Sequence, residues 1–303
     1  MCNVTTSPPL LTAFAGIFPV MSYLHVPAKM SRPLWLMMGT CFLVDTSDIP
    51  TTSWAKKSPF VFLTSSHTFL PWQWMPDPSA LKIPEDYRKA RYITGRLMMA
   101  DTSSGRAVAT HTYTVSPLRF HPTLDVCALS MSGAESDAFR TLLKQRQQEK
   151  YFTLSPTDAA QGTSIVVSGY RGIGRLGELD TLDASVLSKL SKEDQASLLA
   201  ELQNVEGKQE FNACGLRVAR KGVAVTTHGL CYNGMSGAPA QLSSLNATSG
   251  LGGDGGMERR GVCDGVLYGY AHQHEKEDAY PAEERGYIGY VPSTAILDWL
   301  REG

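Results

Sequence analysis

One serine in this chain has neighbours that would suit a nucleophile. Ser236 lies in the stretch G-M-S-G-A-P, residues 234–239. A serine hydroxyl attacks a carbonyl only when a nearby base removes its proton, and the resulting oxyanion needs N–H donors. Gly234 would let the backbone turn so that its own N–H and that of Ser236 point into one hole. The stretch therefore indicates acyl-transfer chemistry, with an ordinary glycine-rich loop before a strand as the alternative.

A base and a carboxylate that would serve this serine stand next to β-type runs elsewhere in the chain. His67 ends the apolar run of residues 60–66 in a T-x-x-H pattern, and Asp125 directly precedes the apolar residues 126–129. His121 competes with His67 as the base, but it is close to Asp125 in sequence and lacks that pattern. Together, His67, Asp125 and Ser236 are the side chains that Ser-His-Asp catalysis requires.

These motifs resemble the chymotrypsin- and trypsin-like serine proteases. G-x-S-G-x-P surrounds the nucleophile of that family, and its histidine, aspartate and serine follow in the same order, although the longer spacings here require insertions. Residues 39–44, G-T-C-F-L-V, are similar to the G-(S/T)-G-F-(V/L)-(V/I) strand of the high-temperature-requirement branch, with Cys41 in place of a small residue. The resemblance covers residues 34–301, and we do not expect the peptide-binding domain of that branch.

The resemblance implies an all-β fold of two six-stranded antiparallel β-barrels, with helical insertions and a C-terminal helix. The expected regions are an apolar N-terminal extension (1–33), the first barrel (34–132), an inter-barrel linker with a helix (133–162), and the second barrel (163–303). Residues 183–206 have helical periodicity and are expected to form an insertion in the second barrel.

The family resemblance also implies a serine endopeptidase that acts on polypeptides. His67 would be the base, Asp125 would orient its imidazole, and the N–H groups of Gly234 and Ser236 would form the oxyanion hole.

The primary pocket would have Leu230 at its floor, with Tyr268, Gly269 and Tyr270 along its wall. An uncharged floor makes burial of a charged substrate side chain costly, so we expect a shallow apolar pocket, or one closed altogether.

A second class of function stays open, because a fold does not determine a function. The chain would then be a non-catalytic, structural or binding subunit of a larger assembly, docked through residues 1–33 and 183–206.

Composition argues against several other classes of protein. Hydrophobic residues make up 43% of the 303-residue chain, charged residues 19%, and the net charge is −1. These values are typical of a globular protein and give no signal for nucleic-acid binding. No apolar run is long enough for a membrane span. His272 and His274 lack a third ligand at an obvious spacing, so we expect neither a metal nor a cofactor.

The six cysteines bear on the compartment. Thr68 stands where secreted relatives carry a cysteine beside the histidine, and Cys41 and Cys127 lie in apolar strand patterns. Free thiols are therefore favoured, with a Cys231–Cys263 disulfide as the alternative. Reduced thiols indicate an intracellular protein, mitochondrial or cytosolic. Residues 1–44 contain no Asp or Glu and partly resemble an organelle-targeting presequence.

Overall fold

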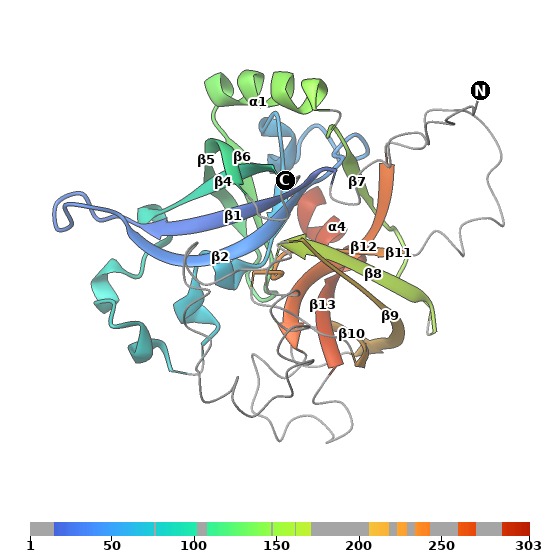
Figure 1. Cartoon of the computed structure of the whole chain (residues 1–303). Coiled ribbons are helices and arrows are strands. Elements are labelled where there is room, and N and C mark those ends of the chain that lie inside the picture. The colour runs from blue at the N-terminus through green and yellow to red at the C-terminus, as the bar shows by residue number, and fades with distance from the viewer. Residues whose placement is uncertain are drawn as a thin grey trace, which may run out of the picture.

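The computed structural model is mostly β (Figure 1). It describes residues 15–75, 77–101, 108–146, 148–160, 162–170, 206–217, 223–228, 234–242, 260–270 and 287–303. Two sheets contain the named strands, and they are linked by a segment that includes one helix.

Six strands close the first sheet into a barrel. In order around the barrel they are β1 (Ile17–Leu24), β2 (Leu34–Leu43), β3 (Phe62–Thr64), β6 (Cys127–Met131), β5 (Val108–Phe120) and β4 (Ile93–Asp101). Every neighbouring pair is antiparallel. Leu43, Phe62 and Leu129 are paired across three strands, so they lie on the same face of the sheet, and all three are fully buried. This closed barrel fits the trypsin-like fold that the sequence predicts.

The barrel begins earlier in the chain than we expected. Residues 1–33 were predicted to precede it, whereas β1 pairs with both β2 and β4. Ile17 and Val20 are buried in the core. Without β1, the edges of β2 and β4 would be left unpaired, which is costly for a sheet. The apolar run at residues 17–24 is therefore a barrel strand, and residues 1–14 lie outside the described chain.

The second sheet has seven strands and carries the segment with Ser236. They are β7 (Tyr151–Leu154), β8 (Ser164–Tyr170), β9 (Glu206–Arg217), β10 (Val223–His228), β11 (Pro239–Leu242), β12 (Arg260–Tyr270) and β13 (Tyr287–Pro292). Their order is β11-β8-β9-β10-β13-β12-β7, and β11 also pairs with β12. The predicted insertion at 183–206 falls outside the described residues, except for Glu206, which begins β9.

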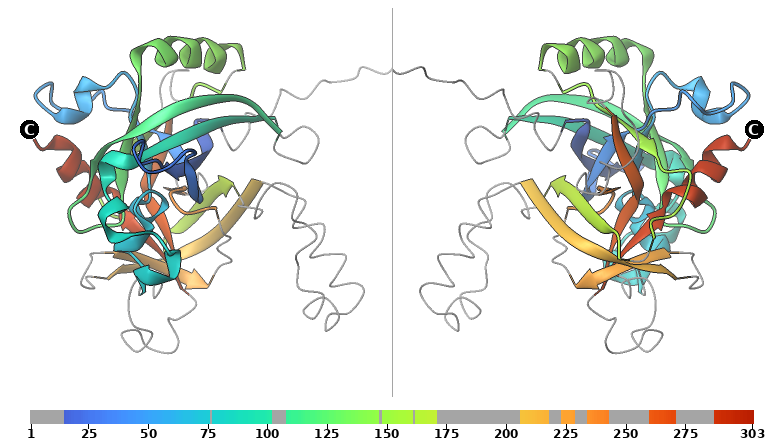
Figure 2. Two further views of the ribbon diagram at one scale, coloured as in Figure 1. Left: turned by 90° about the vertical axis from the view of Figure 1, so that its left-hand side faces the viewer. Right: turned by 90° about the vertical axis from the view of Figure 1, so that its right-hand side faces the viewer.

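The linker supplies a helix and an extra strand. Helix α1 (Gly133–Gln145) follows β6 and lies on the outside of the barrel, as two further views show (Figure 2). Strand β7 then runs parallel to β12, and Phe152 also bridges to Val44, the residue that follows β2. The linker therefore joins both sheets by backbone pairing as well as by covalent connection.

The last helix, α4 (Ser293–Arg301), packs against the first half of the chain. The indole N–H of Trp54 donates to the carbonyl of Trp299 over 3.2 Å, and the two rings lie 4.9 Å apart. The Ser53 hydroxyl donates to the carbonyl of Leu300. These donors satisfy carbonyls that the end of a helix leaves without partners inside the helix. Within the described residues, no helix combines the length and apolar character needed to cross a membrane.

The three cysteines whose side chains the structure describes have free thiols and are buried. They are Cys41, Cys127 and Cys263. Burial raises the pKa of each thiol, which keeps it protonated and therefore unreactive. The side chains of the other cysteines (Cys2, Cys214 and Cys231) lie outside the described structure.

Alkylation will test the state of all six thiols. We expect mass spectrometry of denatured, unreduced protein to find six modified cysteines. In native protein, Cys41, Cys127 and Cys263 should react far more slowly, because they are buried and protonated. A Cys231–Cys263 disulfide in the unreduced sample would contradict this expectation.

A buried carboxyl group lies within the second sheet. The carboxyl group of Asp264 on β12 accepts hydrogen bonds from the phenol O–H of Tyr290 over 2.6 Å and from the backbone N–H of Ala159 over 3.1 Å. Burial raises the pKa of Asp264 above the usual value of 3.8, although these two hydrogen bonds oppose the rise. Because folding disfavours the ionised form, Asp264 lowers stability as pH rises from 3.8 through its raised pKa.

Removing the phenol donor should make that penalty larger. We expect Tyr290→Phe to lower the free energy of unfolding by about 1–3 kcal/mol at pH 7, because the ionised Asp264 loses a hydrogen bond. The loss caused by Tyr290→Phe should be smaller at pH 3.5 than at pH 7. At pH 7 it should also be smaller in an Asp264→Asn background than in the wild-type background. Urea denaturation of the four proteins at both pH values measures these effects. Equal losses in both backgrounds would show that Tyr290 acts independently of Asp264.

Candidate active site

A strand and a tight turn bring His67 to the edge of the first barrel. β3 is held between β2 and β6 and ends at Thr64, and residues 66–68 form a single 3-10 turn. The turn contains His67, which is only 4% exposed. The local pattern of an apolar run followed by T-x-x-H therefore has the structure that the sequence predicts.

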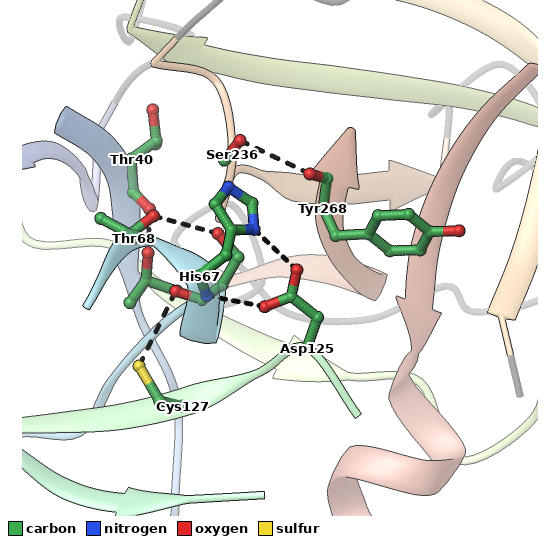
Figure 3. A network of polar contacts seen from close by, with 9 residues as sticks. Thr40, His67, Thr68, Asp125, Cys127, Ser236 and Tyr268 are labelled. Carbon is green, nitrogen blue, oxygen red and sulfur yellow. Dashed lines mark hydrogen bonds and ion pairs between the residues drawn. The ribbon is translucent and has the colours of Figure 1, made fainter. Parts of the chain in front are cut away.

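His67 is held by both oxygens of Asp125. Nδ1 of His67 lies 2.6 Å from Oδ2 of Asp125, and the backbone N–H of His67 donates to Oδ1 over 2.8 Å (Figure 3). Asp125 is 3% exposed and directly precedes the buried residues that lead into β6. With an ionised carboxylate as acceptor, Nδ1 carries the proton of a neutral imidazole, and Nε2 is then the nitrogen that can act as a base. In Figure 3 this second ring nitrogen faces Ser236.

Ser236 lies on the loop of residues 234–238, which leads into β11 and is called the Ser236 loop below. Gly234 and Gly237 have φ of +90° and +91°, a region that glycine enters without steric cost. The N–H of Gly237 donates to Leu267 and that of Ala238 to Met235, over 2.7 and 2.9 Å. The Ser236 hydroxyl lies 3.5 Å from the carbonyl of Tyr268, at the long limit of a hydrogen bond. The glycines and backbone bonds thus turn the serine towards the first barrel.

The structure separates His121 from this cluster. Its Nδ1 accepts the backbone N–H groups of Thr123 and Leu124, and its ring packs 5.4 Å from Trp299. Burial lowers the pKa of His121 below 6.5, so the ring stays neutral at pH 7. His121 therefore fixes the turn before Asp125, and His67 is the histidine that contacts this carboxylate.

The residues expected around the substrate pocket are only partly described. Leu230 and the side chain of Tyr270 lie outside the described structure. Tyr268 is buried, and its ring covers the backbone of Gly289, where an added Cβ would come within 2.3 Å of it. Figure 3 shows this ring turned away from His67, while the carbonyl of Tyr268 faces Ser236. Gly269, with φ of +138°, follows at a break in the β12–β13 register.

Thr40 is a member of the cluster to which the sequence analysis gave no role. It lies on β2, is fully buried, and contacts the Ser236 loop through both its backbone and its side chain. The signal was the second position of G-T-C-F-L-V, where the similar family strand carries serine or threonine. Among the described residues, no group of three or more His, Cys, Asp or Glu side chains is placed to hold a metal ion.

Comparison with known proteins gives a likeness in structure alone. No family model and no curated protein sequence matches the chain. Two crystal structures of Rv3671c, each in an inactive form, are 11% identical to it. One is a serine-to-alanine mutant from M. tuberculosis H37Rv, with a TM-score of 0.44 over 99% of this chain and 95% of that chain. The other, described as the Rv3671c protease, has a TM-score of 0.43 over 96% and 91%. At these values the likeness assigns no function.

Proposed function

We propose that this protein is a trypsin-like serine endopeptidase with His67, Asp125 and Ser236 as its catalytic triad. The observation that carries the proposal is the double contact between Asp125 and His67, which fixes the imidazole with its second nitrogen towards Ser236. An ion pair with a purely structural role would not require the second ring nitrogen of His67 to face Ser236, which lies between two glycines with positive φ. The pairing of β11 with both β8 and β12 further supports a second barrel, as the family fold requires.

The proposed mechanism is acyl transfer. Nε2 of His67 takes the proton of Ser236 as Oγ bonds to the substrate carbonyl carbon, and the carbonyl electrons move to its oxygen. When the tetrahedral intermediate collapses, the C–N bond breaks and Nε2 returns the proton to the leaving amine. Water then attacks the acyl-enzyme by the same route. Asp125 holds the required tautomer and stabilises the imidazolium during each step.

The oxyanion would be bound by the backbone N–H groups of Gly234 and Ser236. Backbone donors are effective here because they are fixed before the charge develops. The positive φ of Gly234 supports this assignment, since a residue with a side chain would be strained there.

For specificity, we propose a shallow pocket that accepts small apolar residues. Leu230 offers no charge to a basic side chain, and Tyr270 would occupy part of the pocket. A peptide-library profile should therefore show cleavage after Ala or Val, and Tyr270→Gly should extend it to larger apolar residues. Dominant cleavage after Arg or Lys would show that the role given to Leu230 is wrong.

Reaction of the wild-type protein with a fluorophosphonate probe tests the proposed activity. The probe labels a serine only when a base and an oxyanion hole activate it. Labelling at Ser236 would support the endopeptidase, while folded protein that does not react would favour the non-catalytic subunit. The case for a non-catalytic subunit is weaker than the sequence suggested, because residues 17–24 form strand β1 of the barrel and not a docking extension. The buried free thiols fit an intracellular compartment.

A further inference from the structure

Thr40 uses every hydrogen-bonding group it has to tie the two halves of the chain together. Its N–H donates to the carbonyl of Ser236 over 2.8 Å, and its hydroxyl donates to the carbonyl of Gly234 over 2.8 Å. The same hydroxyl accepts the backbone N–H of Tyr170 over 2.9 Å, and its carbonyl accepts the Thr64 hydroxyl over 2.7 Å. One residue of β2 thus contacts β3, β8 and the Ser236 loop.

These contacts fix successive peptide planes in the loop. The 234–235 peptide is held through its carbonyl by the hydroxyl of Thr40. The 236–237 peptide is held at both ends, by the N–H of Thr40 and by the carbonyl of Leu267. The 235–236 peptide lies between them and carries the N–H of Ser236, while its own carbonyl accepts from Ala238. The direction of the Ser236 N–H is therefore set by its two neighbouring planes, and Thr40 contacts both of them.

We propose that Thr40 is a positioning residue, and that its hydroxyl aligns the oxyanion-binding N–H of Ser236 from the opposite half of the molecule. This proposal rests on the serine-protease function proposed above. Thr40 itself makes no contact with the substrate in the proposed mechanism. Its hydroxyl orients a backbone dipole before the reaction begins, which is when preorganisation lowers the barrier.

The packing around the loop supports the same role. Thr40 has no exposed surface, so water does not replace its hydroxyl if that group is removed. The carbonyl of Gly234 and the N–H of Tyr170 would then both lose their hydrogen bond to this hydroxyl. Buried backbone groups rarely remain unpaired, so the loop would rotate to find other partners. A rotation of the 234–235 plane would carry the adjoining Ser236 N–H with it.

The test compares Thr40→Val, which keeps the shape of threonine but lacks the hydroxyl, with Thr40→Ser, which keeps the hydroxyl. Ser293→Ala is the matched control, because it removes a buried hydroxyl that bonds the carbonyl of Ser155 and not the Ser236 loop. The maximal rate of fluorophosphonate labelling should fall by about 30-fold in Thr40→Val and by less than about threefold in the other two. The half-saturating probe concentration should not change, because substrate binding is not the step affected.

Amide hydrogen exchange provides a readout that does not depend on activity. The Gly237 and Ala238 amides should exchange at least ~10-fold faster in Thr40→Val than in wild type, and at the wild-type rate in Thr40→Ser and Ser293→Ala. Wild-type exchange in Thr40→Val would overturn the proposal, whether or not the protein reacts with the probe. Faster exchange in Thr40→Val, together with a wild type that never labels, would leave Thr40 as the residue that holds the loop and would reject the protease. If Thr40→Val does not fold, Thr40→Cys, with its weakly donating thiol, takes its place.

Discussion

Replacing Ser236 or His67 with alanine should abolish fluorophosphonate labelling. The serine hydroxyl forms the bond to phosphorus, and without the imidazole no group accepts its proton. Asp125→Asn should slow labelling by about 10⁴-fold, because an amide in contact with Nδ1 favours the wrong tautomer of His67. Gel fluorescence of purified, folded variants measures each loss.

His121→Ala is the control for these variants. It removes a histidine close to Asp125 in sequence, whose ring accepts two backbone N–H groups. We expect a loss of about 1–2 kcal/mol in the free energy of unfolding, with labelling unchanged in the folded fraction. If His121→Ala abolished labelling while His67→Ala did not, the base would be misassigned.

Gly237→Ala should strongly destabilise the loop that carries Ser236. Its φ is +91°, and an added Cβ would lie 2.1 Å from the carbonyl oxygen of Thr40 and 2.2 Å from the hydroxyl of Thr64. Backbone strain and overlap together should lower the free energy of unfolding by about 3–5 kcal/mol. Labelling should also disappear, because the loop moves away from Thr40. Thermal and urea unfolding measure the first effect.

Substitutions at two other glycines distinguish the effect of backbone strain in Gly237→Ala from the effect of steric overlap. Gly162 has φ of +85° with open space around it, so Gly162→Ala should cost only about 1–2 kcal/mol. Gly133 begins α1 and also has open space, so Gly133→Ala should leave stability unchanged or raise it slightly. Similar losses for Gly237→Ala and Gly162→Ala would mean that the contacts with Thr40 and Thr64 do not restrict the loop.

The strands beside the site could be predicted from sequence because their signals are local. Residues 60–67 combine an apolar run with a turn, and residues 293–301 have an apolar helical face. β1 escaped prediction for a physical reason. Pro19 interrupts its apolar run, and a strand interior normally excludes proline because it lacks an N–H. Here the ladder with β4 begins only at Val20, so no bond to β4 is lost at Pro19.

The candidate site could likewise be predicted only where the sequence signal is local. His67, Asp125 and Ser236 could be proposed because each lies in a short motif. The role of Thr40 could not, because its partners Gly234 and Tyr170 are distant in the chain and only the fold brings them together. The carbonyl of Tyr268 is likewise a backbone group, which residue type does not reveal.

The contact between Trp54 and α4 constrains how the protein is made. These partners are separated by 245 residues, so the first half of the chain emerges from the ribosome long before Trp299 and Leu300 exist. At ordinary rates of synthesis the delay is on the order of ten seconds or more. During that time Ser53 and Trp54 have no α4 to bind, and the apolar surface around them is open to other proteins. Nascent chains stalled before α4 should therefore recruit chaperones at this surface, and packing of α4 against Ser53 and Trp54 should end that association.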